Sequence, residues 1–273
     1  MTLYDWPRAA AFGRVIPKTK IYEHAGANTG LKDLFVREVD QIVWSHKLAP
    51  ETINLAATRQ VTEIQVFRIA TRTATLDRDV LRAIDKAIPF PLIFEVAHGG
   101  RVRMVAAYKR QSLNSRGEAD SARWVVGDYF QGDWLPADAA RTPLPVALDM
   151  GALYERLLEP LVAGQTARLV PGMGEAPQTP FAPAAAERPM SLEERIAQAE
   201  AIKAQTREVE RIKARLMRER QFNKRVAINA ELRAAKQELE RLTGAHPSAA
   251  QANPAEVGTA SASGFAPPKT TND

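Results

Sequence analysis

Three acidic residues and a lysine in the first half of the chain could together cut a phosphodiester bond. Metal-dependent nucleases hold a magnesium ion between two carboxylates, and a lysine beside the second carboxylate steadies the attacking water. Asp40 precedes the nearest counterpart of such an acid-x-lysine pair, Glu63-x-Gln65, in which glutamine replaces the lysine. Glu95 and Lys109 form a second, weaker version on neighbouring predicted strands. These four residues carry our alternative hypothesis, a metal-dependent nuclease.

Other catalytic and cofactor patterns are absent from the sequence. No two of the histidines are spaced as metal ligands on one helix or strand, so we expect no metal site. Lys18, Lys20 and Lys109 lie outside any glycine-rich phosphate-binding loop, and we interpret them as surface lysines. We therefore expect neither a cofactor nor a catalytic residue. The four histidines are His24, His46, His98 and His246.

Composition narrows the function classes further. The net charge of +5 and the pI near 9.5 favour acidic partners, although this surplus alone is too small to identify one. The chain has no cysteine, which excludes disulfides and thiolate metal sites. It has neither a signal-peptide pattern at its N-terminus nor an apolar run of about 18 residues. These features predict a soluble, cytoplasmic protein without membrane contact.

Four segments differ in composition. Residues 1–163 contain every tryptophan and tyrosine and should form the globular domain. Residues 164–190 are rich in proline, alanine and glycine and read as a linker. Residues 191–243 are charged and helical in pattern, and residues 244–273 resemble a disordered tail.

The first half of the globular domain shows two helical patterns and one strand pattern. Residues 29–48 place apolar side chains at helical spacing behind Thr29, a candidate cap. Residues 60–72 are rich in β-branched side chains and predict a strand. Residues 75–88 predict a second helix, capped by Thr75.

The second half of the domain predicts further strands and one helix. Residues 91–97 and 101–109 flank Gly99 and Gly100, which is a hairpin signal. A strand over 122–130 and a closing helix over 149–161 complete the domain. This order of elements predicts an α+β fold with flanking helices on one mostly antiparallel sheet.

Several of these blocks resemble a known family. The blocks are VIPKTKIYE, SHKLAPETINL, VTEIQVFRI, AIDKAIPFPLIFEV, AAYKR and RQFNKRVAINAELRAAKQELERL. Together, over roughly residues 10–243, they resemble the bacterial domain of unknown function 4391 family. The resemblance implies a DNA-defence setting beside helicases and methyltransferases of restriction-like systems. It implies no catalytic residues.

The C-terminal helical segment carries a narrow apolar seam typical of a coiled coil. Ile202, Val209 and Leu216 recur every seven residues, and Leu232 and Leu239 continue with the same interval. The two halves are out of phase, because twelve residues separate Leu216 from Ile228. Either one long helix with local unwinding or a hairpin of two helices satisfies this pattern. We expect the seam to bind a partner protein, with a second copy of the chain or the chain's own first domain as alternatives.

A basic cluster coincides with the break in the seam. Its centre, Phe222, is expected to pack within a bend. A cluster of this composition could also contact a nucleic-acid backbone, or could be a solvated helix face. The cluster consists of Arg211, Lys213, Arg215, Arg218, Arg220, Phe222, Lys224 and Arg225.

The sequence therefore predicts a non-catalytic interaction subunit. It would belong to a bacterial DNA-defence or restriction-like assembly and bind a helicase or methyltransferase through its coiled coil. Contact with DNA through the basic cluster is a secondary expectation.

Overall fold

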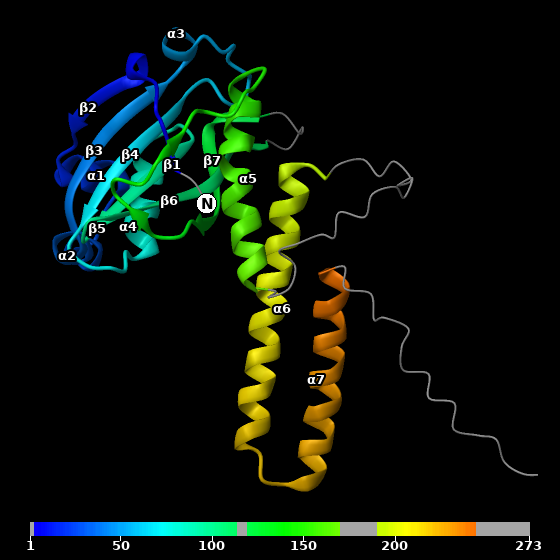
Figure 1. Ribbon diagram of the computed structural model, residues 1–273. Coiled ribbons are helices and arrows are strands. Elements are labelled where there is room, and N and C mark those ends of the chain that lie inside the picture. The colour runs from blue at the N-terminus through cyan, green and yellow to red at the C-terminus, as the bar shows by residue number, and fades with distance from the viewer. Residues whose placement is uncertain (1–2, 114–118, 170–189, 244–273) are drawn as a thin grey trace, which may run out of the picture.

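The computed structural model describes residues 3–113, 119–169 and 190–243. Over these ranges the chain forms a mixed α+β domain from which a pair of helices projects (Figure 1). The predicted fold class, with its mostly antiparallel sheet, is confirmed. Within the described residues, no helix has both the length and the apolar character that crossing a membrane requires.

The described chain mixes strands and helices up to β5, continues with strands as far as β9 and ends with helices. The strands are β1 (Leu3–Tyr4), β2 (Ala11–Val15), β3 (Val39–Leu48), β4 (Ile64–Thr71), β5 (Leu92–His98), β6 (Arg101–Leu113), β7 (Ala119–Gln131), β8 (Leu135–Pro136) and β9 (Arg141–Thr142). The helices are a short 3₁₀ turn, η1 (Arg8–Ala10), followed by α1 (Lys18–Ala25), α2 (Thr29–Glu38), α3 (Pro50–Ile53), α4 (Arg78–Ala87), α5 (Met150–Leu169), α6 (Leu192–Arg218) and α7 (Phe222–Leu242).

One sheet organises the domain. Its strand order in the described residues is β2-β3-β4-β5-β6-β7, with β8 added beside β6. All of these neighbours run antiparallel except β4 and β5, which are parallel. Parallel strands need a crossover connection, and α4 provides it. Strands β1 and β9 pair separately from this sheet.

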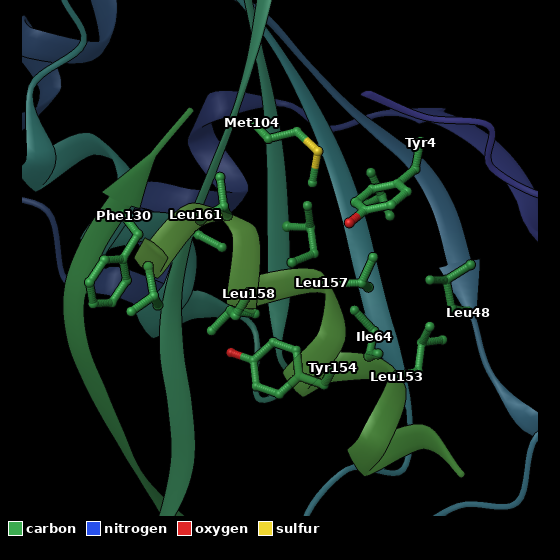
Figure 2. Close-up of a cluster of buried hydrophobic side chains, with 14 of the residues drawn as sticks. Tyr4, Leu48, Ile64, Met104, Phe130, Leu153, Tyr154, Leu157, Leu158 and Leu161 are labelled. Carbon is green, nitrogen blue, oxygen red and sulfur yellow. The ribbon is translucent and has the colours of Figure 1, made fainter. Parts of the chain in front are cut away.

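Helices cover both faces of the sheet. On one face α1, α2 and α4 pack against Phe67, Phe94 and Tyr129. On the other face α5 and the first turns of α6 pack against the remaining inward side chains of the same strands. Figure 2 shows Tyr154 and Leu158 of α5 among these strand residues. Two cores on opposite faces of one sheet explain why its central strands are apolar on both sides.

The helix predicted over residues 29–48 is wrong in its second half. Helix α2 ends at Glu38, and strand β3 begins directly at Val39. Ile42 and Trp44 pair with residues of β4, and the Trp44 and Phe67 rings lie stacked 6.0 Å apart. Hydrogen bonding to strands on both sides therefore overrides the helical spacing of the apolar residues.

The predicted helix starts are off by one or two residues. Asn28, rather than Thr29, caps α2 by accepting a hydrogen bond from the Leu31 amide. Asp77, rather than Thr75, caps α4 by accepting from the Asp79 amide. In each case the residue at the N-cap position is an Asn or Asp, two of the preferred types, and its side-chain oxygen accepts the hydrogen bond.

The hairpin predicted at Gly99 and Gly100 is confirmed, and both glycines have positive φ angles of 54° and 74°. The predicted linker begins too early, because residues 164–169 form the end of α5. The remainder of that linker and the predicted tail lie outside the described residues.

A tyrosine hydroxyl forms hydrogen bonds with two backbone groups at a bulge in the sheet. The pairing of β6 with β7 shifts between Ala107 and Lys109, where β7 has one extra residue. The Tyr154 hydroxyl accepts a hydrogen bond from the Lys109 amide at 2.9 Å and donates one to the Ala107 carbonyl at 2.8 Å. Tyr154 is 1% exposed, so water cannot replace these bonds. Helix α5 is thus hydrogen-bonded to the sheet at its bulge.

We expect Tyr154→Phe to lower the free energy of unfolding by about 2–3 kcal/mol, because two buried backbone groups lose their partner. Urea unfolding monitored by circular dichroism measures this. Tyr108→Phe is the matched control, since the Tyr108 hydroxyl bonds to an exposed carboxylate of Glu193 and its loss should cost less than about 1 kcal/mol. Equal stability of the Tyr154 variant and the wild type would contradict this account.

Candidate functional site

The structure keeps the first two predicted nuclease carboxylates apart. Asp40 lies at the start of β3, whereas Glu63 precedes β4 beside the opposite end of β3. At about 3.3 Å per residue, the two positions are roughly 25 Å apart along the strands. The Asp40 carboxylate forms an ion pair with the Arg72 guanidinium, with 3.3 Å between oxygen and nitrogen. The Glu63 carboxylate forms one with the Lys47 ammonium at 3.4 Å. A shared metal ion requires both carboxylates within about 2.1 Å of it, so this pair cannot hold one.

The second pair also fails to meet. Glu95 faces the α5 side of the sheet, where it accepts hydrogen bonds from the Trp6 indole and the Arg141 guanidinium, both at 2.7 Å. Lys109 points to the opposite side, toward α4. The described residues contain no group of three or more His, Asp or Glu side chains that could hold a metal ion. The predicted nuclease arrangement is therefore wrong in its geometry.

Lys109 is a buried residue, and its interpretation as a surface lysine is wrong. Its side chain is 1% exposed. The ammonium donates to the Asp85 carbonyl at 2.6 Å, to the Ile88 carbonyl, and to the Asp85 carboxylate at 3.4 Å. The Tyr129 hydroxyl donates to the other oxygen of that carboxylate. The lysine thus satisfies carbonyls at the C-terminal end of α4, where a positive charge is favourable.

Burial controls the protonation of this cluster. It raises the pKa of the Asp85 carboxyl to about 6, although the nearby Lys109 ammonium and the Tyr129 hydroxyl act in the opposite direction. Burial also lowers the pKa of Lys109, opposed by Asp85. Because the folded protein holds the Asp85 proton more tightly than the unfolded chain, this group stabilises the fold below about pH 4. That contribution is lost as the pH rises through about 6.

We expect Lys109→Met to destabilise the protein by about 3–5 kcal/mol at pH 8, because Asp85 is then a buried charge without a counter-ion. The loss should be smaller at pH 5, where Asp85 is protonated and neutral. Urea unfolding at both pH values tests this. The control is Lys20→Met, because Lys20 is exposed and pairs with the exposed Glu23. Equal losses at pH 5 and pH 8 would contradict the assigned charge state.

The predicted seam is occupied within the chain itself. Helices α6 and α7 form a hairpin rather than one long helix (Figure 1). Val209 is buried in its interface, and Leu216, Leu232 and Leu239 pack against the same cluster. Ile202 is also fully buried. The chain's own second helix packs along this seam, and Leu216, Leu232 and Leu239 stay partly buried there. That the seam also binds another protein stays a prediction.

Polar contacts close the hairpin along its length. The Gln205 side chain donates to the Ala235 carbonyl at 2.9 Å, and Gln198 donates to the Leu242 carbonyl at 3.0 Å. Arg215 pairs with Glu231 across the two helices. The base of the hairpin is held to the sheet by an ion pair between Lys203 of α6 and Asp128 of β7.

The basic cluster divides into a paired half and an unpaired half. Arg211, Lys213 and Arg215 each form an ion pair with a glutamate of the hairpin. The remaining four cations are exposed and form no ion pair with any described residue. They surround the turn between the helices and, with three exposed apolar side chains, form what we call the hairpin tip. The tip comprises Met217, Arg218, Arg220, Phe222, Lys224, Arg225 and Val226.

Phe222 at the tip is 78% exposed, so its predicted packing within a bend is wrong. The turn instead depends on Glu219, whose carboxylate accepts hydrogen bonds from the Arg220 and Gln221 amides at 2.9 and 2.8 Å. The one acid of the tip region is therefore turned toward the backbone. Lys224 acts on Glu219 electrostatically but forms no ion pair with it, and the tip keeps a surplus of positive charge.

Sequence reasoning missed Asp85 and its hydrogen-bond partner Tyr129. A signal for Asp85 was present, because this acid follows Leu81 by four residues and so lies on the apolar face of its helix. Lys109 likewise follows Val105 and Ala107 at strand spacing and shares their inward face. A charged residue at an inward position of each element indicates a buried pair, although neither pattern alone names the partner.

Comparison with known proteins adds a family and no characterised relative. No curated protein matches the chain, and no solved structure matches it. One family model does match, over residues 4–239, a range that includes the sheet, its flanking helices and nearly all of the hairpin. The chain therefore belongs to the family described as Domain of unknown function (DUF4391).

Proposed function

We propose that this protein is a non-catalytic interaction subunit that contacts DNA through its hairpin tip. The observation that carries the proposal is the group of four exposed, unpaired cations around an exposed aromatic ring. Arg218, Arg220, Lys224 and Arg225 repel one another, and within the described residues none forms an ion pair. Such a concentration of like charge is stabilised by an anionic partner. Phosphates of nucleic acid are contacted mainly by arginine and lysine.

The shape of the protein supports this proposal. The tip lies at the far end of the hairpin from the sheet (Figure 1). Ion pairs and hydrogen bonds hold the two helices together, so the tip can enter a groove or follow a backbone without rearrangement of the domain. The surroundings of the assembly, a DNA-defence system with a helicase or methyltransferase, rest on the family resemblance alone and form part of the proposal.

The salt dependence of DNA binding tests the tip directly. If the four cations each contact a phosphate, log Kd should change with log salt with a slope of about 3–4, because each contact releases about 0.9 counterion on duplex DNA. Replacing Arg218, Arg220, Lys224 and Arg225 by Gln should preserve the helices and remove most of this slope. Fluorescence anisotropy with a labelled duplex measures both quantities.

The matched control removes cations of the same kind from the shafts of the hairpin. Arg207, Arg233 and Lys236 are exposed and form no ion pair with described residues, yet they lie away from the tip. Their replacement by Gln should change the slope by less than about one contact. If tip and shaft variants lose affinity equally, net charge rather than the tip governs binding, and the proposal fails.

Phe222→Ala separates stacking from phosphate contact. Because the ring is 78% exposed, its removal should leave the melting temperature unchanged. Binding to single-stranded DNA should weaken by about 1–3 kcal/mol if the ring stacks on a base, with the salt slope unaltered. A lower melting temperature together with unchanged single-strand affinity would assign the ring to packing instead. Differential scanning fluorimetry and anisotropy provide the two measurements.

A further inference from the structure

Contact with phosphates accounts for the cations of the hairpin tip but not for its apolar side chains. Met217, Phe222 and Val226 are 88%, 78% and 54% exposed. Large apolar side chains are stabilised when they leave water, and phosphate oxygens offer them no apolar surface. A partner that matches the whole tip therefore presents an apolar surface beside its anions.

The flat faces of nucleobases are the apolar surfaces of DNA, and aromatic side chains stack on them. Inside a closed duplex each base pair is covered by its neighbours in the stack, and the grooves show only the edges of the bases. A base face is free at a fork, where paired DNA opens into two single strands. The last base pair before the opening then has one uncovered face.

The cations of the tip come from both helices and from the turn between them. Arg218 ends α6, and Arg220 lies in the turn. Lys224 and Arg225 belong to the first turn of α7, whose N-cap residue forms no side-chain cap hydrogen bond. The first amides of α7 therefore add hydrogen-bond donors for an anion on that side. Cations before and after Phe222 along the chain suit two phosphate backbones that separate on either side of one ring.

The length of the hairpin leaves space for both strands. Lys203 of α6 forms an ion pair with Asp128 of β7, which holds the hairpin to the sheet. From Lys203 to the end of α6 at Arg218 the helix rises by about 22 Å at 1.5 Å per residue. The tip lies at the far end of this rise (Figure 1). Two strands that diverge around the tip are therefore kept clear of the domain.

We propose that the hairpin tip binds a fork in DNA, with Phe222 and Met217 against the last base pair and the cations of the two helices on the two diverging strands. This inference rests on the proposed function, because it requires that the tip contact DNA. It adds the structural class of the substrate, a duplex that opens into single strands.

Competition measured by fluorescence anisotropy tests the preference for a fork. Three unlabelled DNAs compete, at equal nucleotide concentration, with a labelled fork for the full chain. They are the same fork, one of its single strands, and a relaxed, covalently closed circular duplex, which has no end. The fork should compete at least about tenfold better than either of the others, because only the fork offers a free base face between two backbones.

The outcomes separate this inference from the proposed function. Equal competition by the closed circle or by the single strand overturns the fork assignment and leaves DNA contact by the tip intact. Failure of the full chain to bind any of the three DNAs overturns both proposals.

Substitution of the ring locates the preference. Phe222→Ala should reduce the advantage of the fork over the closed circle to about threefold or less, since the stacking contact is lost. Phe222→Trp retains an aromatic ring and should restore the advantage. Val36→Ala is the matched control, because Val36 is an apolar side chain of α2 that is 58% exposed and lies outside the tip. The full advantage in Phe222→Ala would overturn the role of the ring.

A fluorescent base reports the contact itself. 2-Aminopurine in the last base pair of the fork should change its fluorescence when the wild-type chain binds, because its stacking partner changes. The same base in the middle of the duplex arm should show no change, and neither position should respond to Phe222→Ala. An unchanged signal at the last base pair on binding of the wild type would overturn the placement of Phe222.

Discussion

The ion pair between Lys109 and Asp85 is the constraint around which the domain is arranged. A lysine and an aspartate that are 1% and 3% exposed are tolerated only when every donor and acceptor around them is satisfied. The side chain of Lys109 binds the end of α4, and its backbone amide binds Tyr154 of α5. Tyr129 of β7 completes the carboxylate's partners. One residue in the middle of the sheet thus connects the helices on both of its faces.

The parts of the fold that could be predicted from the sequence are those that local signals determine. Local signals predicted β4, α4 and the β5–β6 hairpin, since alternation, capping residues and Gly99-Gly100 lie within a few residues of each other. Strand β3 was misread because its identity depends on hydrogen bonds to β2 and β4, which lie far away along the chain. Strand β2, with five exposed residues, carries no apolar alternation at all and was not predicted.

Contacts between residues far apart along the chain also limited the prediction of the candidate sites. The sequence places acids and cations on elements but does not say which faces meet. Asp40 and Glu63 are 23 positions apart in the sequence, and the antiparallel pairing of β3 with β4 places them at opposite ends of β3. Asp85 and Lys109 are in contact because the crossover helix α4 lies against the sheet. At the hairpin the apolar seam was recognised, but an intramolecular partner and an external one satisfy the same periodicity. The sequence also does not show which cations of the hairpin are paired. In the structure the glutamates Glu208, Glu210 and Glu231 pair with cations outside the tip.

The late position of α5 in the chain has a consequence for how the protein is made. The sheet face that includes Ile64, Ile93 and Phe130 is complete once β7 has been synthesised at Gln131, yet its cover, α5, ends only at Leu169. At about 5–20 residues per second, translation of the residues between them takes about 2–8 s. A growing chain with an uncovered apolar sheet is prone to association with other chains. During synthesis, therefore, the apolar face of the sheet precedes the helix that covers it.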